Sequence, residues 1–174
     1  VVLYAEWSNY TEGYRIDSKG GEVNYGLAES KHDKANNLGD NAFIFKKSLF
    51  KTVSFLKKSG KEVIIIKSSP EFKEKVMDAI ARQIIDKTDD KLRTYPQISL
   101  QEYDKRNHKV EEIFSQIPGV DFLNSKNLFC SKNGCPSIDQ NQNILFSDTN
   151  HLTYNGSKVI VDRLVHLLAY KDEK

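Results

Sequence analysis

Asp148 and His151 are the two side chains whose types and spacing best suit catalysis. They lie three residues apart in a polar loop, between the apolar run at residues 144–146 and a predicted helix. A carboxylate this close can orient an imidazole ring and stabilise its protonated form, while the ring acts as a general base. The same spacing also fits a turn aspartate and a capping histidine. The pair predicts either a hydrolase or transferase dyad that requires a nucleophile, or a structural turn.

The sequence around this pair does not complete a metal site. Asp148 and His151 would need further ligands, and the chain contains no H-E-x-x-H pair to supply them. We therefore expect no metal and no cofactor. The other histidines lack a carboxylate at a motif-like spacing, and we expect structural or solvent-facing roles for them: they are His32, His108 and His166.

Two cysteines precede the apolar run at residues 144–146. Cys130 and Cys135 are separated by Ser-Lys-Asn-Gly, which contains a turn sequence. No further soft ligand lies near them in the sequence, which argues against a four-ligand zinc site. Two interpretations remain, namely a small-loop disulfide formed in an oxidising compartment and a pair of free thiols.

Strands and helices alternate among the elements that must position these residues. Short apolar runs predict strands at residues 1–5, 62–67 and 120–123, the first of them buried on both faces. Apolar residues at three- and four-residue spacing predict helices at residues 41–59, 71–86, 99–116 and 154–170. Asp40 and Thr153 suit N-cap positions, and Gly60 suits the position after a helix. This order predicts a parallel sheet with helices on both faces, in one domain over residues 1–174.

A long polar segment follows the first predicted strand. Residues 11–40 show no period, although a hairpin near Gly20 and Gly21 is compatible with the alternation at Val23 and Tyr25. Loops of this length are usually functional or flexible, and both interpretations stay open here. The residues between the predicted strand at 1–5 and this segment lie at the carboxyl end of that strand, which is where open α/β sheets bind ligands.

Charge and hydropathy exclude several classes of protein. The chain has 26 basic and 24 acidic residues, and this near-balance argues against nucleic-acid binding. No apolar run approaches the roughly 18 residues that a membrane span requires. The sequence begins with Val1 inside a predicted strand and shows no signal peptide, so we expect it to be part of a longer protein.

The stretch at residues 148–156, Asp-Thr-Asn-His-Leu-Thr-Tyr-Asn-Gly, resembles the last sequence block of the SGNH hydrolase superfamily, D-x-x-H-L-(S/T)-x-x-G. More narrowly, the chain resembles the SGNH domain fused to the C-terminus of membrane acyltransferase-3 proteins, which are bacterial O-acetyltransferases of surface polysaccharides. Three further features agree in order. They are the strand leading into Glu6-Trp7-Ser8-Asn9-Tyr10, the strand leading to Pro70-Glu71, and the Cys130 and Cys135 pair before residues 144–148.

The resemblance implies a flavodoxin-like, three-layer α/β/α sandwich with a Ser-His-Asp mechanism. In it, His151 is the general base and Asp148 orients the ring. An acyl group, in the first place acetyl, passes through an acyl-serine to a hydroxyl of a cell-surface polysaccharide. The fused membrane domain delivers the acyl group, which implies a protein of the bacterial inner membrane with this domain in the periplasm. Trp7 or Asn9 would serve as an oxyanion or substrate-orienting group, with core packing the alternative for Trp7. Tyr10 and Tyr14 would border a carbohydrate groove.

One block of the family is absent from the sequence. No Gly-Asp-Ser occurs, and Gly39-Asp40 is followed by Asn41. We therefore expect the nucleophile upstream of Val1 and these 174 residues to be inactive alone. Ser8 follows a strand, but it lacks the Gly-x-Ser-x-Gly elbow of a nucleophile. Two other functions stay open: a secreted carbohydrate esterase or lipase of the same superfamily, and a glycan-binding module without catalysis.

Overall fold

The computed structural model describes residues 1–16, 22–24, 26–28, 40–85 and 95–172. The chain divides into two compact units. The first comprises Val1–Arg15, Glu22–Ser68 and Gln101–Asn124, and the second comprises Ile16–Gly21, Ser69–Leu100 and Ser125–Lys174. The prediction of a single domain stays a prediction.

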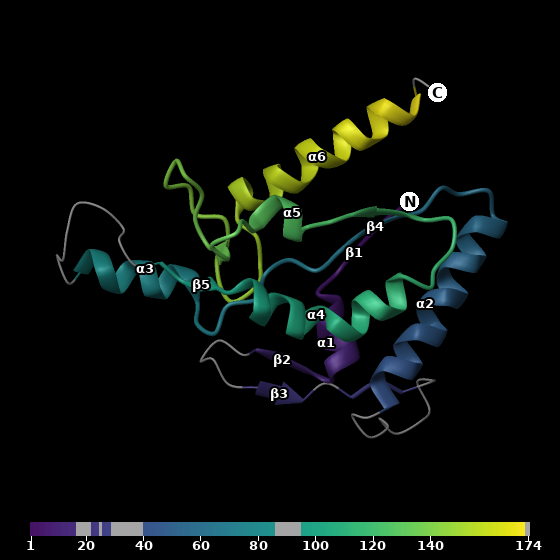
Figure 1. The fold of residues 1–174 in the computed structure, drawn as a ribbon, viewed down its shortest axis with the longest axis horizontal. Coiled ribbons are helices and arrows are strands. Elements are labelled where there is room, and N and C mark those ends of the chain that lie inside the picture. Colours follow the sequence, from purple (N-terminus) through teal and green to yellow (C-terminus); the bar gives the residue numbers. More distant parts are fainter. Residues whose placement is uncertain (17–21, 25, 29–39, 86–94, 173–174) are drawn as a thin grey trace. The chain divides into compact units, whose positions relative to one another are not determined.

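A parallel three-stranded sheet forms the centre of the first unit (Figure 1). Its strands are β1 (Val2–Tyr4), β4 (Ile64–Ile66) and β6 (Asp121–Leu123), in the order β1-β4-β6. In register, Ile65 of β4 faces Leu3 of β1 and Phe122 of β6. The predicted α/β class with a parallel sheet is therefore confirmed.

The position of β1 differs from the prediction. Val2 and Tyr4 are each 41% exposed, whereas all three residues of the central strand β4 are buried. In the described residues β1 is hydrogen-bonded to a strand on one side only, which explains the difference. The expectation of a strand buried on both faces holds for β4 and is wrong for β1.

Three helices build one core against this sheet. They are α1 (Trp7–Glu12), α2 (Asn41–Lys58) and α4 (Leu100–Phe114). The ring of Trp7 contacts Phe45 of α2 and Phe114 of α4, with ring centroids 5.9 and 6.0 Å apart. Ile65, which is fully buried, belongs to the same cluster. Side chains from three segments distant in sequence therefore fix the carboxyl end of β1.

Helix α1 is a finding of the structure that the sequence pattern does not predict. Residues 7–12 form six residues of helix, which end at Gly13 in the left-handed conformation, at φ 78°. The helix is so short that only Trp7, Ser8 and Thr11 face the core, too few for a visible period. A two-stranded sheet of β2 (Tyr14–Ile16) and β3 (Glu22–Asn24) follows, as the hairpin pattern predicts. Gly20, Gly21, Tyr25 and most of the remaining predicted loop lie outside the described residues.

Helix α2 matches its prediction at both ends. Gly60, at φ 70°, follows the helix as expected. Asp40 occupies the N-cap position, but its side chain makes no capping hydrogen bond.

The second unit contains α3 (Val76–Ile85), α5 (Lys126–Phe129), α6 (Tyr154–Asp172), and the antiparallel pair β5 (Gln97–Ile98) and β7 (Cys135–Pro136). Helix α3 begins five residues later than predicted, and the segment before it bonds to the loop of residues 147–151: the backbone N–H of Phe72 donates to the carbonyl oxygen of Thr149 at 2.7 Å. Elements as short as α5, β5 and β7 carry no period that a sequence pattern could reveal. None of the helices in the described residues is both long and apolar enough to cross a membrane.

Candidate active site

The second unit brings Asp148 and His151 together as the sequence predicts. The Nδ1 atom of the His151 ring lies 2.6 Å from Oδ2 of Asp148. The side chain of His151 is 78% exposed and that of Asp148 is 34% exposed. The imidazole is therefore accessible to solvent, while the carboxylate that contacts it is partly enclosed.

Asp148 is held in the ionised state by its hydrogen bonds. Partial burial raises the pKa of its carboxyl group, but the backbone N–H groups of Asn150 and His151 and the His151 ring outweigh burial and lower the pKa below its usual value. The two backbone N–H groups donate to Oδ1 at 3.0 and 2.8 Å. Oδ2 is thereby left for the imidazole.

The ionised carboxylate also determines which ring nitrogen carries the proton. A carboxylate only accepts hydrogen bonds, so Nδ1 of His151 is the donor in the neutral ring. Nε2 then presents its lone pair, and it has no hydrogen-bond partner among the described residues. The geometry leaves one nitrogen ready to remove a proton.

The loop that carries the dyad closes on itself at its base. The backbone N–H of Ser147 donates to the carbonyl oxygen of His151 at 2.8 Å, and Phe146 forms an antiparallel bridge with Leu152. Next to this bridge, the backbone N–H of Thr153 donates to the carbonyl oxygen of Leu145 at 2.9 Å. These bonds make the loop a narrow turn with Asp148 and His151 at its tip.

Thr153 and Gly156 occupy the last two fixed positions of the D-x-x-H-L-(S/T)-x-x-G pattern, and the structure shows why each residue type stands there. The hydroxyl of Thr153 donates to the carbonyl oxygen of Ile144 at 2.6 Å and accepts the N–H of Gly156 at 3.2 Å. Thr153 is therefore the predicted N-cap of α6. A Cβ atom on Gly156 would lie 2.1 Å from the carbonyl oxygen of Leu145. The residues after His151 thus join the dyad loop to the first turn of α6.

A buried aromatic cluster supports the loop from below. The ring of Phe146 packs against Phe72 at 4.8 Å and against Phe129 at 5.3 Å between centroids. All three side chains are buried. Together with the bond from Phe72 to Thr149, this packing fixes the strand-like segment that enters the dyad loop.

The same unit contains the disulfide and a groove beside it. Cys130 and Cys135 form a disulfide bond in this structure, as the first of the two interpretations has it, while the oxidising compartment stays a prediction. A groove of about 580 Å³ runs past it and is lined by Tyr95, Leu145 and amide side chains, among them Gln97, Asn133, Gln140 and Asn141. The one sequence signal for the groove is the amide-rich run at residues 139–143, which by itself fits a solvated loop equally well.

The other predicted site residues belong to the first unit. The indole N–H of Trp7 donates to the carbonyl oxygen of Ile66 at 2.7 Å, so the structure places Trp7 in its alternative role, core packing. Tyr10 stacks on Phe45, with ring centroids 6.0 Å apart. Ser8 is fully buried in α1, which argues against it as a nucleophile.

Arg106 connects two residues of the first unit and is not identifiable from the sequence. Its guanidinium group donates to Oδ1 of Asn9 at 2.9 Å and to the carbonyl oxygen of Tyr14 at 2.8 Å. It also lies 4.1 Å from the centroid of the Tyr14 ring, in cation–π contact. No sequence signal distinguishes Arg106 from the other charged residues of α4, because the pairing arises only in the folded chain.

An exposed imidazole that is hydrogen-bonded to a carboxylate is an arrangement also used by hydrolases and acyltransferases with Ser-His-Asp chemistry. Within the described residues, no serine hydroxyl is bonded to the ring of His151. Nor do three or more His, Cys, Asp or Glu side chains gather there into a possible metal site.

The chain belongs to the family of SGNH domains fused to AT3 domains, whose sequence model matches residues 1–165. The fold is similar to that of the periplasmic domain of a lipopolysaccharide acetyltransferase from Salmonella ser. Paratyphi A, with a TM-score of 0.54 and 16% sequence identity. The match covers 80% of this chain and 54% of that structure, so the chain spans about half of its length. No significant match was found among curated proteins.

Proposed function

We propose that this chain contributes the base and the orienting carboxylate to an O-acyltransferase that acetylates a hydroxyl group of a cell-surface polysaccharide. The observation that carries the proposal is the bond between the exposed ring of His151 and the ionised Asp148, which leaves Nε2 free among the described residues. A surface turn with a purely structural role would not need an oriented ring that is 78% exposed.

The proposed reaction has two steps, and the nucleophile is a serine of the whole protein outside these 174 residues. Nε2 of His151 removes the serine proton while the oxygen attacks the acyl carbonyl, and the ring then protonates the leaving group. In the second step Nε2 removes the proton of a sugar hydroxyl, whose oxygen attacks the acyl-serine, and the ring then gives that proton to the departing serine oxygen. Asp148 stays ionised throughout and stabilises the imidazolium that forms in each step.

Asn9 is the better supported of the two candidates for stabilising the oxyanion. The indole N–H of Trp7 already donates to the carbonyl oxygen of Ile66. In the side chain of Asn9, by contrast, only Oδ1 is engaged, and it accepts a hydrogen bond from Arg106. Its amide nitrogen has no partner among the described residues and can donate to a developing negative charge. Arg106 fixes the orientation of that amide.

The acceptor sugar is proposed to bind in the groove beside the disulfide. Amide side chains and an aromatic ring are suited to the hydroxyl groups and apolar faces of sugars, and both line this groove. Leu145 connects the groove to the base of the dyad loop, because its carbonyl oxygen accepts the N–H of Thr153. Tyr10 and Tyr14 remain predicted substrate contacts of the first unit.

The acyl donor is proposed to come from the fused membrane domain, with this chain in the bacterial periplasm and the whole protein in the inner membrane. The fusion to AT3 domains in the family supports this arrangement. The disulfide between Cys130 and Cys135 supports an oxidising compartment.

The test is the acetyl content of the surface polysaccharide in cells that carry the whole protein, measured by NMR of the purified polymer. His151→Ala should abolish acetylation. The matched control is His108→Ala, because His108 is an exposed histidine whose ion pair with Glu112, at 3.8 Å, is weak. Wild-type acetylation by His151→Ala would refute the proposal.

Two alternative functions predict different results from the same proteins. A carbohydrate esterase would release free acetate from an acetylated polymer in water and would not raise the acetyl content of cells. A glycan-binding module would bind the polymer without changing its acetyl content, and His151→Ala would have no chemical effect.

A further inference from the structure

Helix α2 has an unusual outward face. Its 18 residues contain Lys46, Lys47, Lys51, Lys57 and Lys58 and no acidic residue, whereas the chain as a whole is nearly balanced. Asp40 precedes the helix and Glu62 follows it, so the nearest acidic side chains in the sequence lie beyond its ends. The helix therefore carries a formal net charge of +5, in a chain whose net charge is +2.

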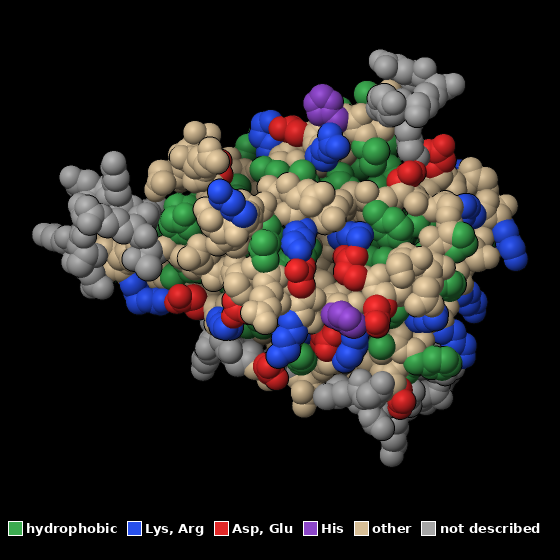
Figure 2. All heavy atoms as spheres, viewed as in Figure 1, with side chains coloured by type: hydrophobic (Ala, Val, Ile, Leu, Met, Phe, Trp, Pro, Cys, Tyr) green, Lys and Arg blue, Asp and Glu red, His purple; other side chains and the backbone are tan. Residues whose placement is uncertain are grey.

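Aromatic side chains share that outward face with the lysines. Phe43 is 65% exposed and Phe55 is 68% exposed. With Lys47, Lys51 and Lys58, which are also exposed, they recur at intervals of four and three residues. At 3.6 residues per turn, these five side chains fall within an arc of about 120°. Figure 2 shows Lys and Arg side chains, with hydrophobic ones among them, along the margin where Figure 1 places α2.

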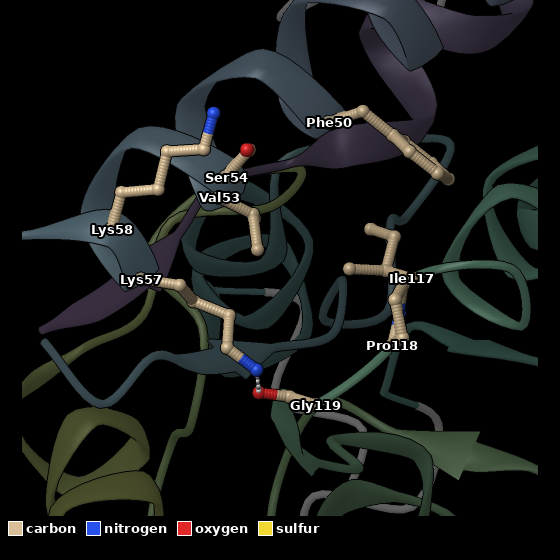
Figure 3. Close-up of a pocket in the computed structure, with 8 residues that line it drawn as sticks. All are labelled: Phe50, Val53, Ser54, Lys57, Lys58, Ile117, Pro118 and Gly119. Atoms are coloured by element: carbon tan, nitrogen blue, oxygen red, sulfur yellow. Dashed lines mark hydrogen bonds between the residues drawn. The ribbon is translucent and has the colours of Figure 1, made fainter. Parts of the chain in front are cut away.

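An apolar cleft lies beside the C-terminal half of the same helix. It has a volume of about 370 Å³, and Phe50, Val53, Ile117 and Pro118 form its walls. Figure 3 shows Val53 and Ile117 on opposite sides of the cleft and Lys57 at one end, where its ammonium group donates to the carbonyl oxygen of Gly119 at 2.6 Å. Ser54 and Lys58 also line the cleft. An apolar space with cationic groups at its edge suits an amphiphile with an anionic head group.

We propose that the outward face of α2, with the cleft beside it, docks on the surface of an anionic phospholipid bilayer. Charge complementarity favours this occupant, because lysines attract anionic lipid head groups. The two exposed phenylalanines favour a bilayer over a soluble polyanion, because aromatic side chains among basic residues insert at the boundary between head groups and acyl chains. Members of the family are fused to AT3 domains, and if these are the membrane part of the whole protein, on which the proposed function also rests, such a bilayer lies within reach of the domain. Docking would hold the chain in a fixed orientation on the membrane from which the acyl group is proposed to arrive.

The experiment is co-sedimentation of the purified chain with vesicles of phosphatidylcholine alone or of phosphatidylcholine mixed with phosphatidylglycerol. The wild-type chain should bind the mixed vesicles and not the neutral ones. Lys47→Gln with Lys51→Gln should weaken binding by roughly fivefold per lysine, or about 25-fold together. Phe43→Ser with Phe55→Ser should weaken it at least about tenfold, in proportion to the apolar area that no longer inserts.

Matched controls separate this surface from charge or exposure in general. Lys105→Gln with Lys132→Gln removes two exposed lysines from other elements, and Ile84→Ser with Ile85→Ser removes two exposed apolar residues from α3. Both control pairs should bind like the wild type. Because every substituted side chain is exposed, circular dichroism should show an unchanged fold.

Several results would overturn the proposal. They are equal binding to neutral vesicles, no binding at all, or an equal loss in the control variants. The face binds a soluble polyanion instead if three results coincide. The lysine substitutions weaken binding, the phenylalanine substitutions leave it unchanged, and dextran sulfate competes fully with the vesicles. If the phenylalanine variant converts a dimer into a monomer in sedimentation and vesicle binding is absent, a second copy of the chain covers the face. The readout is independent of acetyl transfer, so its outcome and that of the proposed function are separable.

Discussion

Gly156→Ala is the substitution that tests most sharply how α6 supports the dyad loop. The new Cβ atom would lie 2.1 Å from the carbonyl oxygen of Leu145 and 3.0 Å from Cδ2 of Leu152. The nearer atom belongs to the backbone, and ordinary contact begins at about 3.4 Å, so the two segments must separate by more than an ångström. That separation would also break the hydrogen bond from the backbone N–H of Thr153 to the same carbonyl oxygen of Leu145.

The expected magnitude follows from three opposing terms. Overpacking against a fixed backbone costs about 3 kcal/mol. Loss of the hydrogen bond from Thr153 to Leu145 costs about 1 kcal/mol, and the better helix propensity of alanine returns up to about 1 kcal/mol. We therefore expect Gly156→Ala to lower the free energy of unfolding by about 3 kcal/mol, which corresponds to a fall in Tm of roughly 6–12 °C for a chain of this size.

Urea and thermal unfolding followed by far-ultraviolet circular dichroism would measure the effect. Gly60→Ala is the matched control, because Gly60 has φ 70° but a Cβ atom added there would meet nothing within 4 Å. That variant should lose only about 1 kcal/mol from backbone strain. Equal stabilities for Gly156→Ala and the wild type, or a larger loss for Gly60→Ala, would refute the described packing of α6 on the dyad loop.

Three further predictions concern the dyad and the disulfide. Asp148→Asn should keep the backbone bonds to Oδ1 but present an N–H group to Nδ1 of His151, so that the ring proton moves to Nε2. In steady-state acetyl transfer by the whole protein, kcat should then fall by roughly 10³-fold or more. A fall in KM with kcat unchanged would contradict this prediction. Because folding lowers the pKa of Asp148, its ionised form stabilises the folded chain above the ordinary value of about 3.9, and this contribution is lost as the pH falls through the lowered folded-state value. The difference in unfolding free energy between the wild type and Asp148→Asn should therefore shrink below about pH 4 in urea titrations, and a difference that grows on acidification would exclude the described bonds. Reduction of the bond between Cys130 and Cys135 should lower the free energy of unfolding by about 2 kcal/mol and add two alkylatable thiols in mass spectrometry, whereas two reactive thiols in native, unreduced protein would contradict the disulfide.

The sequence predicts those parts of the fold that have a period or a specific turn residue. Helix α2 has a long apolar stripe, and Gly60 marks its end, so both can be located within two residues. Thr153 is recognisable as an N-cap because its residue type and position are local signals. The parallel sheet follows from the alternation of strands with helices, which is a property of the whole chain.

Tertiary contacts decide the features that the sequence does not predict. Helix α1 is too short to show a period, and the segment before α3 bonds to the distant Thr149, a contact that no local pattern reveals. The exposure of β1 depends on the order of strands in the sheet, which no single segment encodes.

The candidate site likewise contains residues that the sequence predicts and residues that only tertiary contacts bring together. Asp148 and His151 can be found in the sequence because three residues of spacing already bring their side chains together in one turn. Arg106 and Asn9 are separated by 97 positions in the chain, and only the packing of α4 beside α1 brings them together. Gly156 can be recognised in the sequence as a motif position. The reason that glycine is needed there, its close approach to a backbone carbonyl, is evident only in the structure.

The central claim is that His151 activates a serine of the whole protein, and the rate of serine labelling by a fluorophosphonate probe tests it most directly. We expect one labelled serine in the wild type and the same labelling rate in His108→Ala. In His151→Ala the rate should be at least about 100-fold lower, because a neutral serine hydroxyl without its base is a poor nucleophile. Equal labelling rates in His151→Ala and the wild type would refute the role of His151 as the base.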